Sequence, residues 1–158
     1  MGMVKINRID INALIQLLGM VGVIGSLVFV GLEMQQSQRI ALVNQIQQRS
    51  YAAQGTIGAF IEANKDWFSA QFPAIPTKNL SEVEKDIRNV LNQAWFVYEA
   101  DYFQYSQGLM TDEVWQAKFA GIVTNLKRCD NQEIYQQRIK LVEEGFQRIL
   151  EGVQVDCN

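Results

Sequence analysis

The sequence predicts an all-α protein: an N-terminal transmembrane helix continues into a long extramembrane helix, which packs with three further helices as a small antiparallel bundle. Three observations predict this class. Residues 11–32 are almost wholly apolar and uncharged. The only prolines, Pro73 and Pro76, leave long stretches free for uninterrupted helices. Elsewhere apolar residues recur every three or four positions, and no segment alternates as a strand does.

The apolar run has the length of a membrane span. Its 22 residues extend about 33 Å as a helix, close to the hydrocarbon thickness of a bilayer. We expect a short tail at 1–8 and a transmembrane helix at 9–33. The alternatives are less favoured, because a soluble core helix rarely runs so long without charge and a signal peptide needs a shorter apolar region before its cleavage site.

A face of small residues lies on the predicted span. Gly19, Gly22 and Ser26 share one side at helical spacing, and small residues let helix backbones approach closely in lipid. We interpret this side as a helix-packing face. Glycine is also common in membrane helices generally, so the alternative is that these residues have no special packing role.

Cations and cysteines bear on the orientation of the chain. Lys5 and Arg8 lie just before the span, whereas the first cation after it is Arg39, which favours an N-terminus inside the cell. The only cysteines are Cys129 and Cys157. A disulfide between them would hold the C-terminal tail and needs an oxidising compartment. The alternative is two free thiols on a cytoplasmic domain.

The extramembrane region, residues 34–158, opens with a continuation of the first helix, expected at about 34–64. Its apolar or small residues are spaced alternately by three and four, as in a heptad seam: Val43, Ile46, Ser50, Ala53, Ile57 and Phe60. The glutamine-rich segment 35–48 is either a solvated helix face or a hydrogen-bonding layer against a copy or a partner.

Capping signals bound the second helix. After a loop at 69–79, Ser81 and Glu84 form a capping-box pattern that starts a helix at 82–107, and Gly108 ends it. The predicted apolar face of this helix comprises Val83, Ile87, Val90, Leu91, Ala94, Val97, Tyr98 and Tyr105.

Two helices complete the predicted bundle. Thr111 caps a helix at 112–127, and Asp112 and Glu113 place acids in its first turn, as the helix dipole prefers. A turn follows, and the last helix is expected at 131–151. Both carry amphipathic patterns, so each can bury one face in a shared core.

Composition excludes several classes of chemistry. The chain has no histidine, which removes Ser/His/Asp and Cys/His nucleophile arrangements and the usual zinc and haem ligation. A net charge of −3 without a basic patch argues against nucleic acid as a partner. Glu99 and Asp101, two residues apart, point in different directions on a helix and so do not pair. We therefore expect no enzyme activity, no cofactor and no metal site.

Residues 95–105 hold a dense group of aromatic side chains. Trp95, Tyr98, Tyr102 and Tyr105 recur there every three or four positions. The simplest interpretation is that they are core aromatics. The alternative is a surface for docking a partner, because tyrosine and tryptophan are enriched in interface cores.

Two segments carry a resemblance to known proteins. SLVFVGLEMQ, from Ser26 to Gln35, and YEADYFQYSQGLMTDEVW, from Tyr98 to Trp115, resemble segments of a widespread set of uncharacterised small bacterial membrane proteins with one span. The resemblance implies a single-pass protein, which we expect in the bacterial inner membrane with the bulk of the chain on the periplasmic side. It supplies no catalytic residues.

These observations favour a non-enzymatic accessory or scaffolding subunit of a membrane assembly, or a homo-oligomer. Its expected partners are membrane lipid and other membrane subunits or copies of itself. The alternative is a ligand-sensing helical domain. Because only about ten residues precede the span, such a sensor would have to signal through a partner membrane protein.

Overall fold

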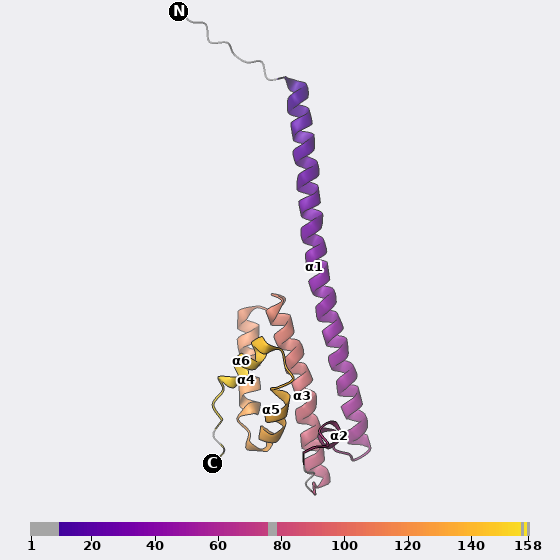
Figure 1. The fold of residues 1–158 in the computed structure, drawn as a ribbon, viewed down its shortest axis with the longest axis vertical. Helices are drawn as coiled ribbons and strands as arrows, with labels where there is room; N and C mark the ends of the chain where they lie inside the picture. The colour runs from indigo at the N-terminus through magenta and orange to yellow at the C-terminus, as the bar shows by residue number, and fades with distance from the viewer. Residues whose placement is uncertain (1–9, 76–78, 156, 158) are drawn as a thin grey trace, which may run out of the picture. The chain divides into compact units, whose positions relative to one another are not determined.

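The protein is all-helical, as the sequence predicts. The computed structural model describes residues 10–75, 79–155 and 157, and this part of the chain holds no strand. Its helices are α1 Ile11–Glu62, α2 Trp67–Gln71, α3 Glu82–Ser106, α4 Asp112–Leu126, the 3₁₀ helix η1 Cys129–Asn131, α5 Gln132–Arg138 and α6 Glu144–Glu151 (Figure 1). The chain divides into two compact units, Met1–Ile40 and Ala41–Asn158.

The described part of the first unit is the N-terminal portion of α1. The side chains of residues 11–40 are all exposed. Within the described residues, α1 is the one helix long and apolar enough to cross a membrane. The predicted tail at 1–8, with Lys5 and Arg8, and the predicted first helical residue, Ile9, lie outside the described residues.

In the second unit, the later part of α1 packs through its predicted seam. Val43, Ser50 and Ile57 are buried at seven-residue intervals, and the intervening seam positions are half-buried. Three hydrogen bonds join α1 to α3 in antiparallel order: Ser50 Oγ to the Phe96 carbonyl (2.9 Å), Gln93 Nε2 to the Gln54 carbonyl (2.9 Å) and Gln104 Nε2 to Gln47 Oε1 (2.7 Å). Three seam residues are therefore buried within the chain itself.

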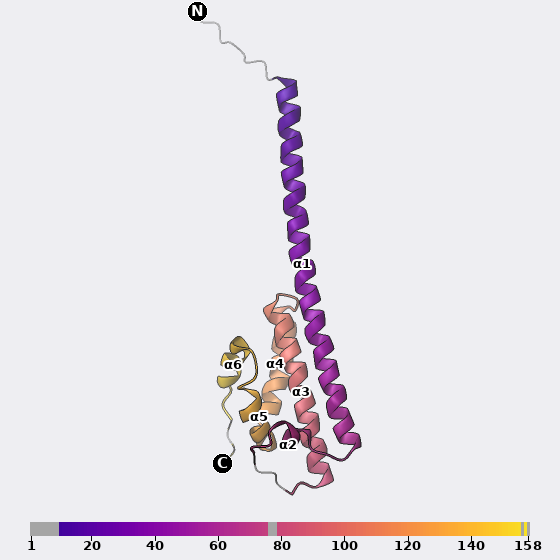
Figure 2. The ribbon, with the colours of Figure 1, turned by 45° about the vertical axis from the view of Figure 1, so that its right-hand side comes forward.

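Helix α3 is the central element of the second unit. It lies between the later part of α1 and α4, and neighbouring helices run in opposite directions (Figure 2). Its start is the predicted capping box, in which Ser81 and Glu84 each accept from the other's backbone. It ends at Ser106, and Gly108, just beyond the cap residue Gln107, has a φ of +71°, in the left-handed region that glycine tolerates.

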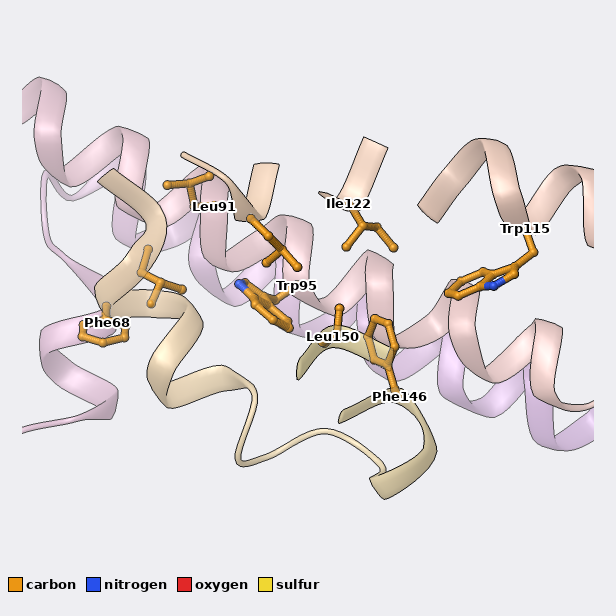
Figure 3. Close-up of a cluster of buried hydrophobic side chains, with 9 residues drawn as sticks. Phe68, Leu91, Trp95, Trp115, Ile122, Phe146 and Leu150 are labelled. Atoms are coloured by element: carbon orange, nitrogen blue, oxygen red, sulfur yellow. The ribbon is translucent and has the colours of Figure 1, made fainter. Parts of the chain in front are cut away.

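The core of the second unit forms around α3. Trp95 is fully buried at its centre, and side chains from α2, α4, α5 and α6 converge on it (Figure 3). The buried cluster comprises Phe68, Leu91, Trp95, Trp115, Ile122, Leu126, Ile134, Phe146 and Leu150. Large aromatic and branched side chains dominate it, so apolar burial is its main stabilising term.

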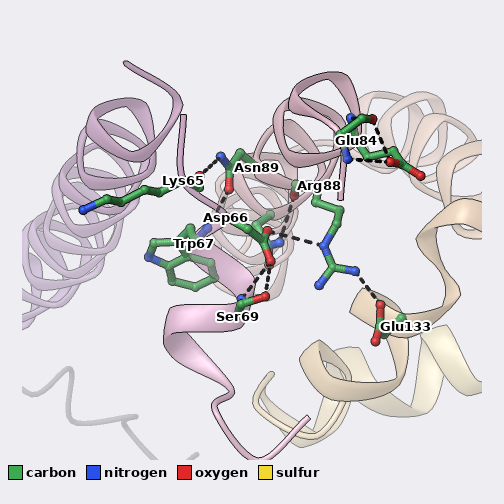
Figure 4. Close-up of polar contacts among 10 residues, drawn as sticks. Lys65, Asp66, Trp67, Ser69, Glu84, Arg88, Asn89 and Glu133 are labelled. Carbon is green, nitrogen blue, oxygen red and sulfur yellow. Dashed lines mark hydrogen bonds and ion pairs between the residues drawn. The ribbon is translucent and has the colours of Figure 1, made fainter. Parts of the chain in front are cut away.

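The loop predicted at 69–79 is wrong at its start, because α2 extends to Gln71. Asp66 caps α2 by accepting from the Ser69 backbone N–H at 3.0 Å. Arg88 on α3 then donates to Asp66 at 3.3 Å and also to Glu133 on α5 (Figure 4). A short helix of low intrinsic stability is thus held by a cap and a charged side chain from another helix.

The predicted apolar face of α3 is partly wrong. Val83, Ile87, Val90 and Val97 are exposed, whereas Asn89 and Asn92 are fully buried. The amide of Asn89 accepts from the Trp67 N–H at 2.9 Å and donates to the Lys65 carbonyl at 2.8 Å (Figure 4). The inward face of α3 therefore carries an amide that satisfies the backbone at the start of α2.

The single helix predicted at 131–151 is two helices. α5 ends at Arg138 and α6 begins at Glu144, where the Glu143 carboxylate accepts from the Gly145 N–H at 3.1 Å. Apolar residues keep a helical spacing across the break, so periodicity alone does not reveal it. The turn lets residues on both sides of the break, Arg138 and Phe146, reach groups on α3.

Candidate functional site

Two neighbouring cavities in the second unit share Glu99. The larger, of about 290 Å³, lies between α1 and α3, and the smaller, of about 150 Å³, extends toward the α5–α6 connection and α6. Ile46 and Glu99 line both. We call the two together the Glu99 cleft. Concave sites of this size with a few polar groups among apolar walls are where small ligands bind.

Glu99 is held by a buried arginine. Arg138 Nη2 donates to Glu99 Oε1 at 2.6 Å, and the Arg138 guanidinium lies 4.2 Å from the centre of the Phe96 ring. The Arg138 side chain is 5% exposed and that of Glu99 is 31% exposed. Burial raises the pKa of the Glu99 carboxyl, and the positive charge of Arg138 opposes that rise. The carboxylate is thus fixed in place while remaining open to the cleft.

The opposite wall of the larger cavity belongs to α1. Arg49 and Ser50 line it. The Ser50 hydroxyl is engaged, because it donates to the Phe96 carbonyl at 2.9 Å and accepts from Gln54 Nε2 at 3.1 Å. Arg49 is exposed and, within the described residues, has no ion-pair partner. The cavity therefore has a cation on one wall and a carboxylate on the other.

Glu99 and Asp101 bind separate cations. Lys118 on α4 donates to both oxygens of Asp101, at 2.9 and 2.8 Å, whereas Glu99 binds Arg138. The expectation that the two carboxylates point in different directions is confirmed. Among the described residues, no cluster of three cysteine, aspartate or glutamate side chains is arranged to hold a metal ion.

The aromatic segment packs against the core. Trp95 is fully buried, so the docking interpretation is wrong for it. The three tyrosines pack half-buried against the core: Asn125 Nδ2 donates to the Tyr98 hydroxyl at 2.7 Å, Tyr102 stacks on Phe146, and Tyr105 stacks on Trp115.

The other predicted site residues lie in both units. A side chain added at Gly19 or Gly22 meets nothing within 4 Å, and Ser26 Oγ donates to the Gly22 carbonyl at 2.8 Å. In the second unit Cys129 and Cys157 form a disulfide with a Cα–Cα distance of 5.5 Å. The small-residue face is thus open, and the C-terminal tail is tied to η1.

A third cavity, of about 280 Å³, lies near Arg88 and Glu133. Arg88 is already bound by Asp66 and Glu133. This third cavity therefore offers a ligand less than the Glu99 cleft does.

The Glu99 cleft was not predicted from the sequence, although one signal existed. Arg138 occupies a position where the helical pattern calls for an apolar residue, and a charge there needs a buried partner.

Comparison with known proteins adds no identification. No family model matches the chain, and no curated protein or solved structure proved similar to it. The resemblance of residues 26–35 and 98–115 to single-span bacterial proteins stays a prediction. Function must therefore be argued from the geometry above.

Proposed function

We propose that this protein is a non-enzymatic, single-pass protein of the bacterial inner membrane, acting as an accessory or scaffolding subunit of a membrane assembly or as a homo-oligomer. One observation carries the proposal: a row of apolar side chains on α3 is exposed within the described chain. Val83 is 67% exposed and Val90 is 55% exposed, and Ile87 and Val97 extend the row at helical spacing. Rows of this kind are typical of helix-docking surfaces.

The Cys129–Cys157 bond supports a periplasmic location for the second unit, because disulfides persist in oxidising compartments. The absence of histidine from the chain supports a non-enzymatic role. The separate pairing of Glu99 and Asp101 supports it as well. Because each binds its own cation, Glu99 and Asp101 do not form a carboxylate pair that shares acid–base work.

The accessory role is tested by the mass of the native complex in mild detergent, measured by size exclusion with light scattering. We expect a complex larger than one chain that Val90→Asp dissociates, because a charge in the row opposes docking. Leu109→Asp, at an exposed position outside the row, is the matched control and should leave the complex intact. A strictly monomeric wild-type protein without associated chains would contradict the proposal.

A ligand-sensing role is the second candidate, and the Glu99 cleft is the observation that favours it. The cleft opens between α1, which carries the apolar run, and α3. A ligand that bridges these two helices would change how firmly they pack. That change would then pass to a partner through the membrane helix.

A further inference from the structure

The charges around the Glu99 cleft balance. Glu99 and Glu143 line it as acids, and Arg49 lines it as a cation. Arg138, bound to Glu99, adds a second cation. A polyanion would face two carboxylates there, and a polycation would face two guanidinium groups. A ligand of zero net charge with separated positive and negative ends matches this arrangement.

The two ends of such a ligand have defined places. Glu99 accepts from Arg138 through Oε1, and no other described residue donates to this carboxylate. Its second oxygen is therefore free to accept from an ammonium group. Arg49, without an ion-pair partner in the described chain, can bind a carboxylate on the other wall with its planar fork of donors.

The walls between these groups limit the size of the ligand. Ile46, Ala53 and Ala100 leave an apolar space in the larger cavity, and Phe96 also lines it. A cavity of about 290 Å³ accommodates a molecule of a few carbon atoms but no long chain. The two alanines keep that space open, because a larger side chain at either position would fill it.

We propose that the Glu99 cleft binds a small zwitterion of the size of a free amino acid, with its carboxylate on Arg49 and its ammonium group on Glu99. This deepens the ligand-sensing candidate by naming a class of ligand. It does not depend on the accessory role, because the cleft and the exposed row on α3 involve different residues.

The test is thermal unfolding of the full chain in detergent with each of the common L-amino acids at millimolar concentration. We expect one or more small aliphatic amino acids to raise the melting temperature saturably, since a ligand that binds only the folded state stabilises it. The matching carboxylic acid without an amino group, and the matching amine without a carboxylate, should give a much smaller rise.

Three variants sharpen the test. Arg49→Gln should abolish the rise, and Ala53→Leu should abolish it by filling the cavity. Arg39→Gln, the same substitution at an exposed position outside the cleft, should retain it. If Ala53→Leu loses its helical circular dichroism, the exposed Arg49→Gln decides alone.

Three results would overturn the proposal: no amino acid raises the melting temperature, the rise persists in Arg49→Gln, or the plain carboxylic acid gives an equal rise. None of these results changes the mass of the native complex. Failure here is therefore distinguishable from failure of the accessory role.

Discussion

Two stretches of α1 share one secondary structure but have different surroundings. In residues 11–32 apolar side chains cover every side of the helix, and none is buried. In residues 43–60 burial recurs every seventh residue, at Val43, Ser50 and Ile57, and Ser50 hydrogen-bonds the Phe96 carbonyl of α3. A helix apolar all round needs an apolar solvent, whereas a helix with one apolar stripe needs a protein neighbour.

This difference predicts that the stability of the helical domain and the attachment of the chain to membranes depend on different residues. Substitutions in the second unit should change the unfolding of the helical domain without releasing the chain from membranes. Charges placed in residues 11–32 should do the reverse.

Trp95→Ala should destabilise the domain most, by about 3–5 kcal/mol, because it empties the centre of the core. Val90→Ala is the matched control on the same helix. It should change the free energy of unfolding by about 0.5 kcal/mol or less in dissociated protein, since Val90 is exposed. Urea unfolding followed by circular dichroism measures both. Equal effects would mean that the packing around α3 is misassigned.

Loss of the disulfide should come next. Cys129 and Cys157 are 28 residues apart, and opening a loop of that length costs about 3.5 kcal/mol. Cys157→Ser should therefore lower the melting temperature, and reduction of the wild-type protein should have the same effect. Thiol counting, with reducing and non-reducing electrophoresis, checks the bond. Two free thiols in native material would remove both the disulfide and its support for a periplasmic domain.

Two glycine substitutions should change the stability of the domain in opposite directions. A Cβ at Gly145 would collide with the Tyr102 hydroxyl, so Gly145→Ala should destabilise the domain by about 1–3 kcal/mol. Gly121, inside α4, has open space around it. Gly121→Ala should therefore stabilise the domain by up to about 1 kcal/mol. Thermal unfolding of the two variants side by side compares them, and stabilisation by both would exclude the close packing of α6 on α3.

The smallest expected effect is a change in how the stability of the domain depends on pH. Burial raises the pKa of Glu99 above the ordinary value of 4.5, so the folded state holds its proton more tightly than the unfolded state does. This contribution to stability is present at low pH and is lost as pH rises from the ordinary value through the raised one. Glu99→Gln should lack that loss. Unfolding free energies of the wild type and the variant, measured at pH values on both sides of the ordinary pKa, test this prediction. Identical slopes of free energy against pH in the two proteins would contradict it.

The sequence predicted most of the architecture because its signals are local. The capping box at Ser81 and the glycine at Gly108 set the ends of α3 without reference to the rest of the chain. What escaped prediction depends on tertiary contacts. Asn89 is buried where it hydrogen-bonds the backbone at the start of α2, and the break between α5 and α6 is invisible to periodicity.

The candidate site was less predictable than the fold. Glu99 was singled out from the sequence, but its partner Arg138 lies 39 residues away. Arg49 joins them only through the packing of α1 on α3. No spacing rule within one helix connects these three side chains, so they were found only when the chain was folded.

The central claim is that residues 11–32 remain on the mature chain and lie in lipid. Extraction of membranes with alkaline carbonate tests it most directly. The account predicts that the intact chain stays in the membrane pellet until detergent is added, and that Val23→Arg together with Leu27→Arg moves it to the supernatant, because each charge costs about 3 kcal/mol at the centre of a span. Intact wild-type chain in the supernatant without detergent would contradict the claim.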